Sequence, residues 1–135
     1  MNEANDLQQK YMEFQMYEEQ LNNMQKQFDQ LEENLLEINY IKNSLDELSK
    51  VEKGKEILCP LSSGIFVKGE IKKSDEFLVN VGSNVVVKKN LEETKALMDK
   101  QKKELEGSKE NLSLKYNEYY SRYQELKDEL SKLVG

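Results

Sequence analysis

Two long seven-residue repeats constrain this chain more than any other feature of its sequence. Between residues 7 and 48, apolar side chains recur at alternating spacings of three and four, the pattern of a coiled-coil seam, and no Gly or Pro occurs before Gly54. The pattern predicts one helix over residues 7–48, with polar seam positions at Lys10 and Lys42. One seam row contains Leu7, Phe14, Leu21, Phe28 and Leu35, and the other contains Tyr17, Met24, Leu31, Ile38 and Leu45.

The same repeat returns over residues 91–133 and predicts a second helix. One row is apolar throughout, whereas the other is lysine in its first half. A glycine such as Gly107 costs a helix about 1 kcal/mol relative to alanine, but the repeat continues in phase on both sides, so we expect the helix to run through it. The apolar row is Leu91, Met98, Leu105, Leu112, Tyr119, Leu126 and Leu133, and the mixed row is Lys95, Lys102, Lys109, Tyr116, Tyr123 and Leu130.

Neither helix has an apolar stripe wide enough to be stable alone, so we expect the two to pair antiparallel. The register that the rows favour places Phe14 opposite Leu126 and Tyr17 opposite Tyr123. The lysine half of the mixed row then faces the end of the first helix. We expect the lysine stems to cover the apolar residues there while the ammonium groups reach water; the covered residues are Leu31, Ile38 and Leu45.

The middle of the chain, residues 54–90, has a different character. Its apolar residues are β-branched and close together, and clusters rich in Gly, Ser, Asn and Lys separate them, which predicts four short strands in two β-hairpins. Pro60 indicates an edge strand or an irregular one. The expected strand cores are residues 57–58, 65–67, 77–81 and 85–87, and the expected turns are residues 62–64, 72–75 and 82–84.

Four strands in so short a segment cannot bury both faces of a sheet. Isolated hairpins are marginal in water, and open strand edges pair with other chains. We therefore expect an α+β fold with a coiled-coil helix over residues 1–50, an oligomerisation module over 51–90 and a second helix over 91–135. The hairpins of several chains would form an intersubunit β-barrel. The candidate oligomerisation residues are Ile57, Leu58, Ile65, Val67, Leu78, Val79, Val81, Val85 and Val87.

Composition limits the functions open to the chain. Only 37% of its residues are apolar and 34% are charged, which suits long solvated helices; the ordered repeats argue against disorder, the competing interpretation. The net charge of -6 disfavours nucleic acid, which needs a basic stripe. The chain has no His and a single Cys59, so it lacks the usual zinc ligands and a partner for a catalytic thiol. We expect no enzyme activity, metal or cofactor, and interpret Cys59 as a small buried hydrophobe.

Targeting signals are the remaining constraint from composition. The first ten residues contain no apolar run, so no signal peptide is expected. No stretch approaches the about 18–20 apolar residues of a membrane span. These observations favour a cytoplasmic protein without membrane contact.

The order helix, two hairpins, helix resembles the prefoldin family, and in particular its α-class subunits of archaeal type. Residues 56–71, EILCPLSSGIFVKGEI, resemble the first hairpin of the family, and residues 75–88, DEFLVNVGSNVVVK, resemble the second. Subunits of the β class carry one hairpin instead of two. The resemblance covers essentially the whole chain, and Cys59 stands where a small apolar residue is more usual.

The resemblance implies an assembly and an activity. The assembly is a heterohexamer of two α and four β subunits, with a double β-barrel body and six coiled-coil tentacles. Such complexes hold unfolded proteins between the tentacle tips without ATP and pass them to a group II chaperonin in the cytosol. The partners implied for this chain are therefore prefoldin β-class subunits, unfolded proteins and a group II chaperonin.

Aromatic and Met side chains gather where the antiparallel register brings the two chain ends together. The simplest interpretation of Phe14, Tyr17 and the seam tyrosines of the second helix is packing. Met12, Met16 and Tyr120 fall outside the seam, and Tyr11 flanks it. Exposed Met and aromatic groups suit promiscuous binding of apolar segments. The candidate client-binding residues are Tyr11, Met12, Phe14, Met16, Tyr17, Tyr116, Tyr119, Tyr120 and Tyr123.

Two other functions remain open from the sequence. The chain can be a structural or adaptor coiled-coil protein without client binding, although a spacer has no need of four strands between matched helices. A nucleic-acid tether is disfavoured by the acidic charge. The favoured hypothesis is an ATP-independent chaperone subunit.

Overall fold

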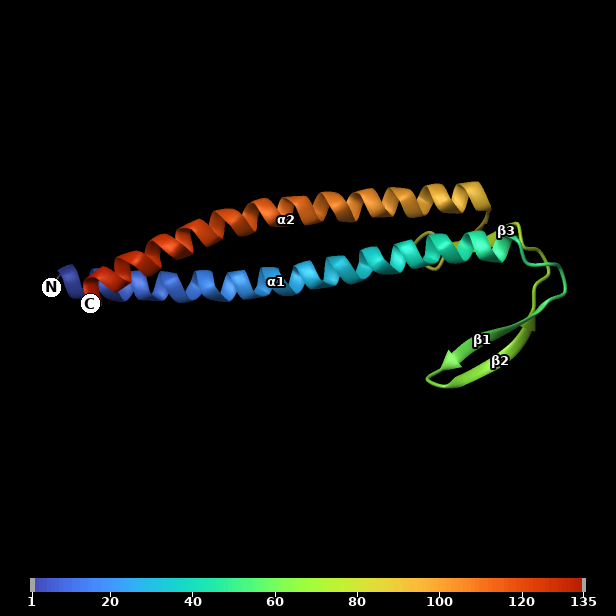
Figure 1. Cartoon of the computed structure of the whole chain (residues 1–135), viewed down its shortest axis with the longest axis horizontal. Helices are drawn as coiled ribbons and strands as arrows, with labels where there is room; N and C mark the ends of the chain where they lie inside the picture. Colours follow the sequence, from blue (N-terminus) through green and yellow to red (C-terminus); the bar gives the residue numbers. More distant parts are fainter. Residues whose placement is uncertain (1, 135) are drawn as a thin grey trace. The chain divides into compact units, whose positions relative to one another are not determined.

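The computed structural model describes residues 2–134, and it contains two long helices separated by four strands (Figure 1). The predicted order of helix, two hairpins and helix is confirmed. Helix α2 runs through Gly107, as expected from a repeat that continues in phase on both sides. The elements are α1 Asn2–Ser49, β1 Glu56–Ser62, β2 Ile65–Glu70, β3 Glu76–Asn80, β4 Val86–Asn90 and α2 Leu91–Val134.

Helix α1 begins before the apolar repeat does, and α2 begins at a sequence-encoded cap. At the start of α2, the Glu93 amide donates to Asn90 Oδ1 at 2.8 Å, and the Asn90 amide donates to Glu93 Oε1 at 3.3 Å. This reciprocal pair is a capping box, which satisfies two amides that the first turn leaves free. The last strand therefore passes directly into the second helix at Leu91.

The first hairpin pairs β1 with β2 antiparallel, and its turn and its irregularity both have local causes. Gly64 has a φ of +77°, a backbone conformation that glycine adopts without strain. The register shifts between Pro60 and Ser62, in agreement with the irregular strand predicted from Pro60. A Cβ at Gly69 would lie 3.4 Å from Cys59 Sγ, so the missing side chain leaves room for the half-buried thiol.

The second hairpin pairs β3 with β4, and three consecutive residues with positive φ form its turn: Gly82, Ser83 and Asn84. The Gly82 amide donates to Asn80 Oδ1 at 2.9 Å, and the Val81 amide donates to the Val85 carbonyl at 2.9 Å. These bonds close the turn that Gly-Ser-Asn predicts. Val79 lies opposite Val87 in the ladder.

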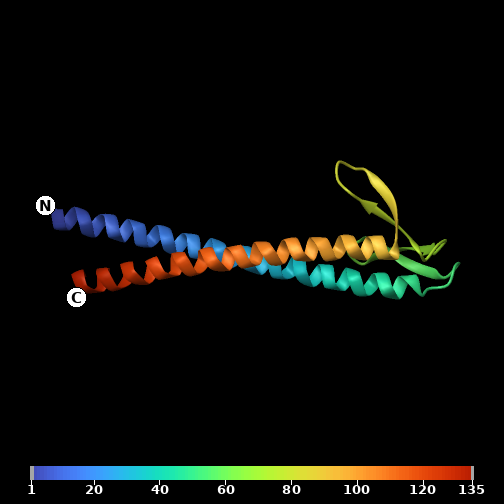
Figure 2. The same ribbon diagram turned by 90° about the horizontal axis from the view of Figure 1, so that it is seen from above.

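The chain divides into two compact units, which we describe separately. The tip half comprises residues 2–35 and 104–134, and the hairpin half comprises residues 36–103. In the tip half, the start of α1 and the end of α2 lie side by side and antiparallel in both ribbon views (Figures 1 and 2). The buried apolar residues are Leu21, Met24 and Leu126 in the tip half, and Ile38 and Leu45 in the hairpin half, where Thr94 is also buried.

Two lysines of the mixed row form ion pairs with α1 that the sequence analysis did not predict, and their side chains remain partly exposed, 34% for Lys95 and 39% for Lys109. Lys109 pairs with Glu32 at 3.5 Å, and Lys95 pairs with Asp46 beside the buried Leu45. Lys42 of α1 makes the reciprocal pair with Asp99 of α2. The sequence analysis did not predict these pairs because it considered only the apolar residues of α1 and not the carboxylates that flank them.

Candidate functional site

Aromatic side chains fill the seam of the tip half. The ring of Phe14 stacks on Tyr123 at 4.7 Å between centroids, and the ring of Tyr17 meets the edge of Tyr119 at 5.2 Å. Phe28 and Tyr116 make a third pair, at 6.0 Å. All six rings that the sequence assigned to the seam are partly buried and therefore have a packing role.

The ring partners lie one helical turn away from those that the sequence register predicts. Phe14 meets Tyr123 instead of Leu126, and Tyr17 meets Tyr119 instead of Tyr123. Large rings lean along the helix toward the neighbouring turn, whereas a register argument considers only the positions directly opposite. The antiparallel pairing is as expected, and the ion pairs between the helices lie within a few residues of the expected register.

The other four candidate residues of the tip half are exposed. Tyr11 is 53% exposed, Met12 62%, Met16 51% and Tyr120 45%. Tyr120 is the most restrained of these, because its ring stacks on Tyr116 at 6.2 Å and Gln124 Nε2 donates to its hydroxyl at 2.9 Å. The tip half therefore presents large apolar side chains to water beside a seam that is already filled with rings.

An open groove of 760 Å3 runs between the first turns of α1 and the last turns of α2. Of the candidate residues, only Tyr11 and Phe14 line it. Sequence reasoning missed the other lining residues. It interpreted Leu7 and Leu130 only as core residues of the seam and did not consider the small and polar residues beside them. The lining residues are Ala4, Leu7, Gln8, Tyr11, Phe14, Lys127, Leu130 and Ser131.

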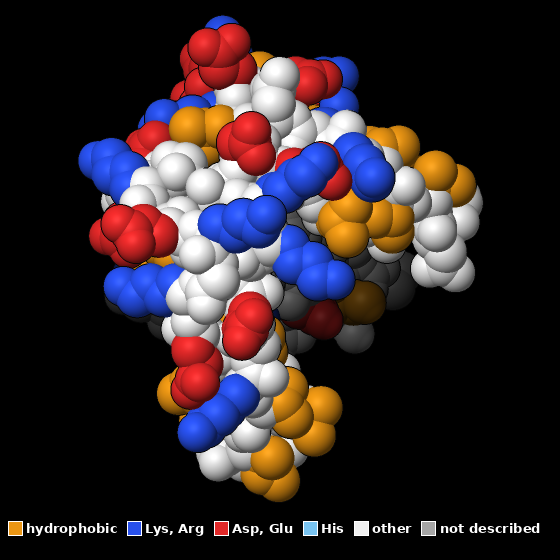
Figure 3. Space-filling view, turned by 90° about the vertical axis from the view of Figure 1, so that its right-hand side faces the viewer, with side chains coloured by type: hydrophobic (Ala, Val, Ile, Leu, Met, Phe, Trp, Pro, Cys, Tyr) orange, Lys and Arg blue, Asp and Glu red, His pale blue; other side chains and the backbone are white. Residues whose placement is uncertain are grey.

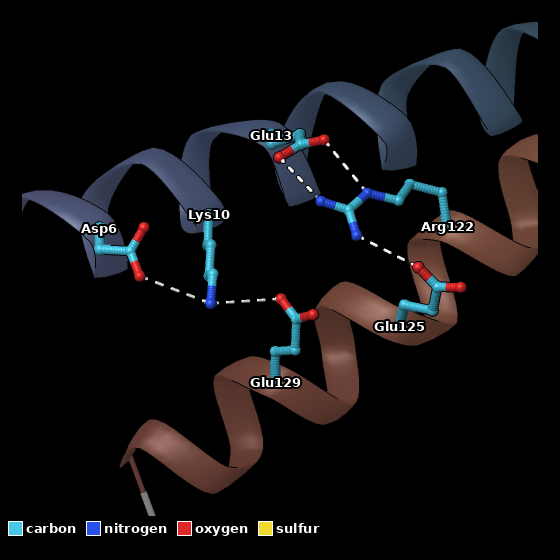
Figure 4. Close-up of polar contacts among 6 residues, drawn as sticks. All are labelled: Asp6, Lys10, Glu13, Arg122, Glu125 and Glu129. Atoms are coloured by element: carbon cyan, nitrogen blue, oxygen red, sulfur yellow. Dashed lines mark hydrogen bonds and ion pairs between the residues drawn. The ribbon is translucent and has the colours of Figure 1, made fainter. Parts of the chain in front are cut away.

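An ion-pair network joins the same two helix ends (Figure 4). The Arg122 guanidinium donates to both carboxylate oxygens of Glu13, at 3.3 and 3.4 Å, and to Glu125 at 3.2 Å. Lys10 lies 3.4 Å from Glu129 and 3.5 Å from Asp6. The hydrogen bonds from Arg122 to Glu13, and then to Glu125, raise the pKa of this already strong base.

The sequence carried a signal for this network that the heptad analysis did not use. Arg122 is the only arginine of the chain, and it lies next to the seam tyrosine Tyr123, as Glu13 lies next to Phe14. Residues that flank a coiled-coil seam form interhelical ion pairs. A search for opposite charges on the flanking positions would have found the pair.

The groove and the network lie on opposite flanks of the seam. An α-helix turns by roughly 100° per residue, which places Ala4, Gln8 and Tyr11 on one side of Leu7 and Phe14, and Asp6, Lys10 and Glu13 on the other. On α2, Lys127 and Ser131 likewise lie on the side opposite to Arg122 and Glu129. One flank is therefore closed by ion pairs, and the other is open and largely apolar.

The hairpins form the second candidate surface, and hydrophobic side chains gather at the surface of the strands (Figure 3). Six of the nine candidate oligomerisation residues are exposed, and only Ile57, Val79 and Val87 are partly buried. Sequence reasoning missed Leu61, Phe66 and Val86, which are also exposed. Both faces of these strands thus leave apolar area uncovered. The six exposed candidates are Leu58, Ile65, Val67, Leu78, Val81 and Val85.

Two further searches of the described residues bear on the kind of site. Residues 2–134 contain no group of three or more His, Cys, Asp and Glu side chains placed to hold a metal ion. No helix within that range has a stretch that is long and apolar enough to cross a membrane.

Comparison with known proteins places the chain in a family. The sequence model of the prefoldin family, described as "Prefoldin subunit", matches residues 17–135. A prefoldin subunit alpha of Thermofilum pendens is 37% identical over 87 residues, which are 64% of this chain and 67% of the relative. A prefoldin subunit alpha of Methanobrevibacter smithii is 33% identical over 96 residues, 71% of this chain and 65% of the relative. The chain thus spans about two thirds of each of these relatives.

A solved structure has the same fold. It is the cryo-EM structure of filamentous PFD from Methanocaldococcus jannaschii, of which one chain matches with a TM-score of 0.79 and 22% identity. The match covers 88% of this chain and 98% of that one. With two long helices, two antiparallel hairpins and these relatives, the chain belongs to the prefoldin family.

Proposed function

We propose that this chain is a subunit of an ATP-independent chaperone that captures unfolded polypeptides at the tip half and delivers them to a group II chaperonin. Membership of the prefoldin family supports the general chaperone role. The capture step is supported by the tip half itself, which contains an open apolar groove lined in part by Tyr11 and also exposes Met12 and Met16 to water.

The observation that carries the proposal is the exposure of Tyr11, Met12 and Met16. The seam of the tip half is already filled by three ring pairs, so packing within the chain does not account for these side chains. Each burial of such a side chain against a client would contribute at most about 1.5–3 kcal/mol. Useful affinity would therefore come from several tips that hold one client together.

We also propose an assembly, which the exposed strands support. Two copies of this chain would combine with four prefoldin β-class subunits, and their hairpins would form an intersubunit β-barrel. The support is the apolar surface on β1–β4, where large side chains such as Leu58 and Leu78 lie in water in the single chain. A shared barrel would cover these side chains and pair the open strand edges.

The alternative function is a structural or adaptor coiled coil that binds no client. Such a protein would use the hairpins for assembly in the same way, so assembly alone does not separate the two functions. Capture of a non-native protein separates the two functions, because only the chaperone binds one.

The test is suppression of aggregation of a denatured client, measured by light scattering without nucleotide. The variant is Met12→Ser, Met16→Ser and Tyr120→Ser together, in the assembled complex. The control is Leu36→Ser and Tyr40→Ser, which removes side chains that are more exposed, at 70% and 73%, but lie in the hairpin half. Circular dichroism and native mass spectrometry must first show unchanged helix content and assembly in both variants.

The two functions predict different outcomes. Capture at the tip half requires that the first variant protects the client less than the parent does and that the control protects as well as the parent. Equal loss in both variants would mean that exposed apolar area anywhere on the helices binds the client. An assembled parent complex that fails to suppress aggregation would favour the adaptor function.

A further inference from the structure

The tip half and the hairpin half carry opposite net charges, although the chain as a whole is acidic. The tip half has 15 acidic and 7 basic residues, a net charge of -8, whereas the hairpin half has 11 acidic and 13 basic residues, a net charge of +2. A protein surface with an excess of one sign attracts ligands of the other sign and raises their local concentration.

Two of the four cations within fourteen residues of the chain ends are engaged in ion pairs between the helices. Arg122 is enclosed by Glu13 and Glu125, and Lys10 lies between Asp6 and Glu129. All these groups lie on the flank of the seam that the ion pairs close, where the four carboxylates outnumber the two cations and leave a net charge of -2. The excess of negative charge at these helix ends therefore acts across the seam on whatever enters the groove on the other flank.

The flank of the seam that contains the groove, here called the groove flank, continues along both helices beyond the groove itself. At spacings of three and four, it passes on α1 from Tyr11 through Gln15 to Glu18, and on α2 from Lys127 through Gln124 to Tyr120. Among the residues that the structure describes, Lys127 is the only charged one that lines the groove. The lining thus fits an apolar segment, and the surrounding field disfavours acidic residues at the ends of that segment.

We propose that the groove flank is the binding face of the tip half, and that it selects apolar segments of non-native polypeptide bordered by Lys or Arg over equally apolar segments bordered by Asp or Glu. This inference rests on the proposed function and adds to it the chemistry of the preferred client. The apolar contact supplies the binding, and the charge supplies the preference. Lys127 lies in the groove, and its positive charge weakens the preference for segments bordered by Lys or Arg.

The experiment uses two fluorescent peptides with one apolar core, one with lysine and one with glutamate at both ends. Fluorescence anisotropy measures their affinity for the assembled complex at low and at high salt. We expect the lysine peptide to bind about fivefold more tightly at low salt, the range that a few exposed ion pairs supply. High salt should remove most of this difference, because it screens exposed charges, and leave apolar binding.

A matched pair of variants locates the preference in the groove. Lys127→Glu should widen the preference for the lysine peptide by about twofold. Lys26→Glu makes the same charge change at an exposed residue of the tip half, about 22 Å of helix away from Tyr11 and beyond the screening distance of about 10 Å. Lys26→Glu should leave the preference unchanged. An equally widened preference in both variants would contradict the proposal that the preference arises in the groove.

The outcomes separate this inference from the function on which it rests. Binding of neither peptide would contradict capture of apolar segments itself. Equal binding of the two peptides at low salt, or tighter binding of the glutamate peptide, would overturn the charge preference and leave capture intact. Equal binding of a folded cationic protein would show plain electrostatic attraction without the apolar groove, and would also overturn the inference.

Discussion

The tip half and the hairpin half both contain paired helix segments, but different interactions close their seams. The tip half has three ring pairs across the seam. The helix segments of the hairpin half contain one aromatic residue, Tyr40, which is exposed, and their small apolar seam is flanked by the pairs Lys42–Asp99 and Lys95–Asp46. Apolar packing tolerates salt, whereas exposed ion pairs are weak and screened. The two ends of one helix pair should therefore respond differently to salt, pH and mutation.

The largest effect should come from the strands of the hairpin half. Val79→Asp or Val87→Asp places a charge in the cross-strand pair of β3 and β4, and burial of that charge in a shared barrel would cost several kcal/mol. We expect loss of the oligomer in sedimentation, with helical circular dichroism largely kept. Asn80→Asp is the control, since it introduces the same side chain at an exposed strand end and keeps the acceptor for the Gly82 amide. Intact oligomers of both valine variants would argue against the shared barrel.

The next effect should come from the aromatic seam of the tip half. Tyr123→Ala removes the ring that stacks on Phe14, and we expect the free energy of unfolding to fall by about 2 kcal/mol, less than for a fully buried ring. Urea unfolding at fixed protein concentration measures it. The loss should be the same at low and high salt, because no charge is removed. Tyr40→Ala, at an exposed ring, is the control and should cost less than about 0.5 kcal/mol.

A smaller effect is expected where ion pairs flank the seam. Asp46→Asn removes the partner of Lys95 in the hairpin half, and both side chains are partly exposed, so we expect a loss of less than about 1 kcal/mol. The loss should shrink in high salt, in contrast to that of Tyr123→Ala. A salt-independent loss would indicate that packing, and not charge, holds this part of the seam.

The smallest effect should be the loss of folding stability at low pH that comes from one carboxylate, Asp99. The hydrogen bond from Lys42, aided by the charges of nearby lysines, lowers the pKa of Asp99 below its ordinary value of 3.8. A lowered pKa in the folded chain means that the ionised carboxylate stabilises folding above pH 3.8, and that this contribution is lost as the pH falls through the lowered value. In Lys42→Met, an NMR titration should show the pKa of Asp99 raised toward its ordinary value. An unchanged pKa would assign the shift to another group.

Most of the fold could be predicted because it is encoded in local patterns. The rows through Leu21 and Leu126 defined the helices, and Gly82-Ser83-Asn84 marked a turn that the structure places between β3 and β4. The start of α1 could not be placed from the repeat, since the helix continues to Asn2, beyond the first seam residue Leu7. Boundaries without a cap or a breaker carry little sequence signal.

The candidate site was predicted less completely. Exposure of Met12 and Met16 followed from their positions outside the seam, and packing of Phe14 from its position within it. The groove did not follow, because it depends on how far the helix ends cover Leu7 and Leu130, which no spacing rule gives. The ring partners also depend on side-chain direction, which a register of positions does not contain.

Site-specific crosslinking tests the central claim, capture of clients at the tip half, most directly. A photoreactive amino acid at Tyr11 or at Tyr40 compares two exposed tyrosines of α1, one at the groove and one in the hairpin half, and Tyr40 is the more exposed at 73% against 53%. In the assembled complex with an unfolded client, we predict a client adduct from position 11 and little or none from position 40. Adducts from position 40 alone, or equally from both, would contradict capture at the tip half.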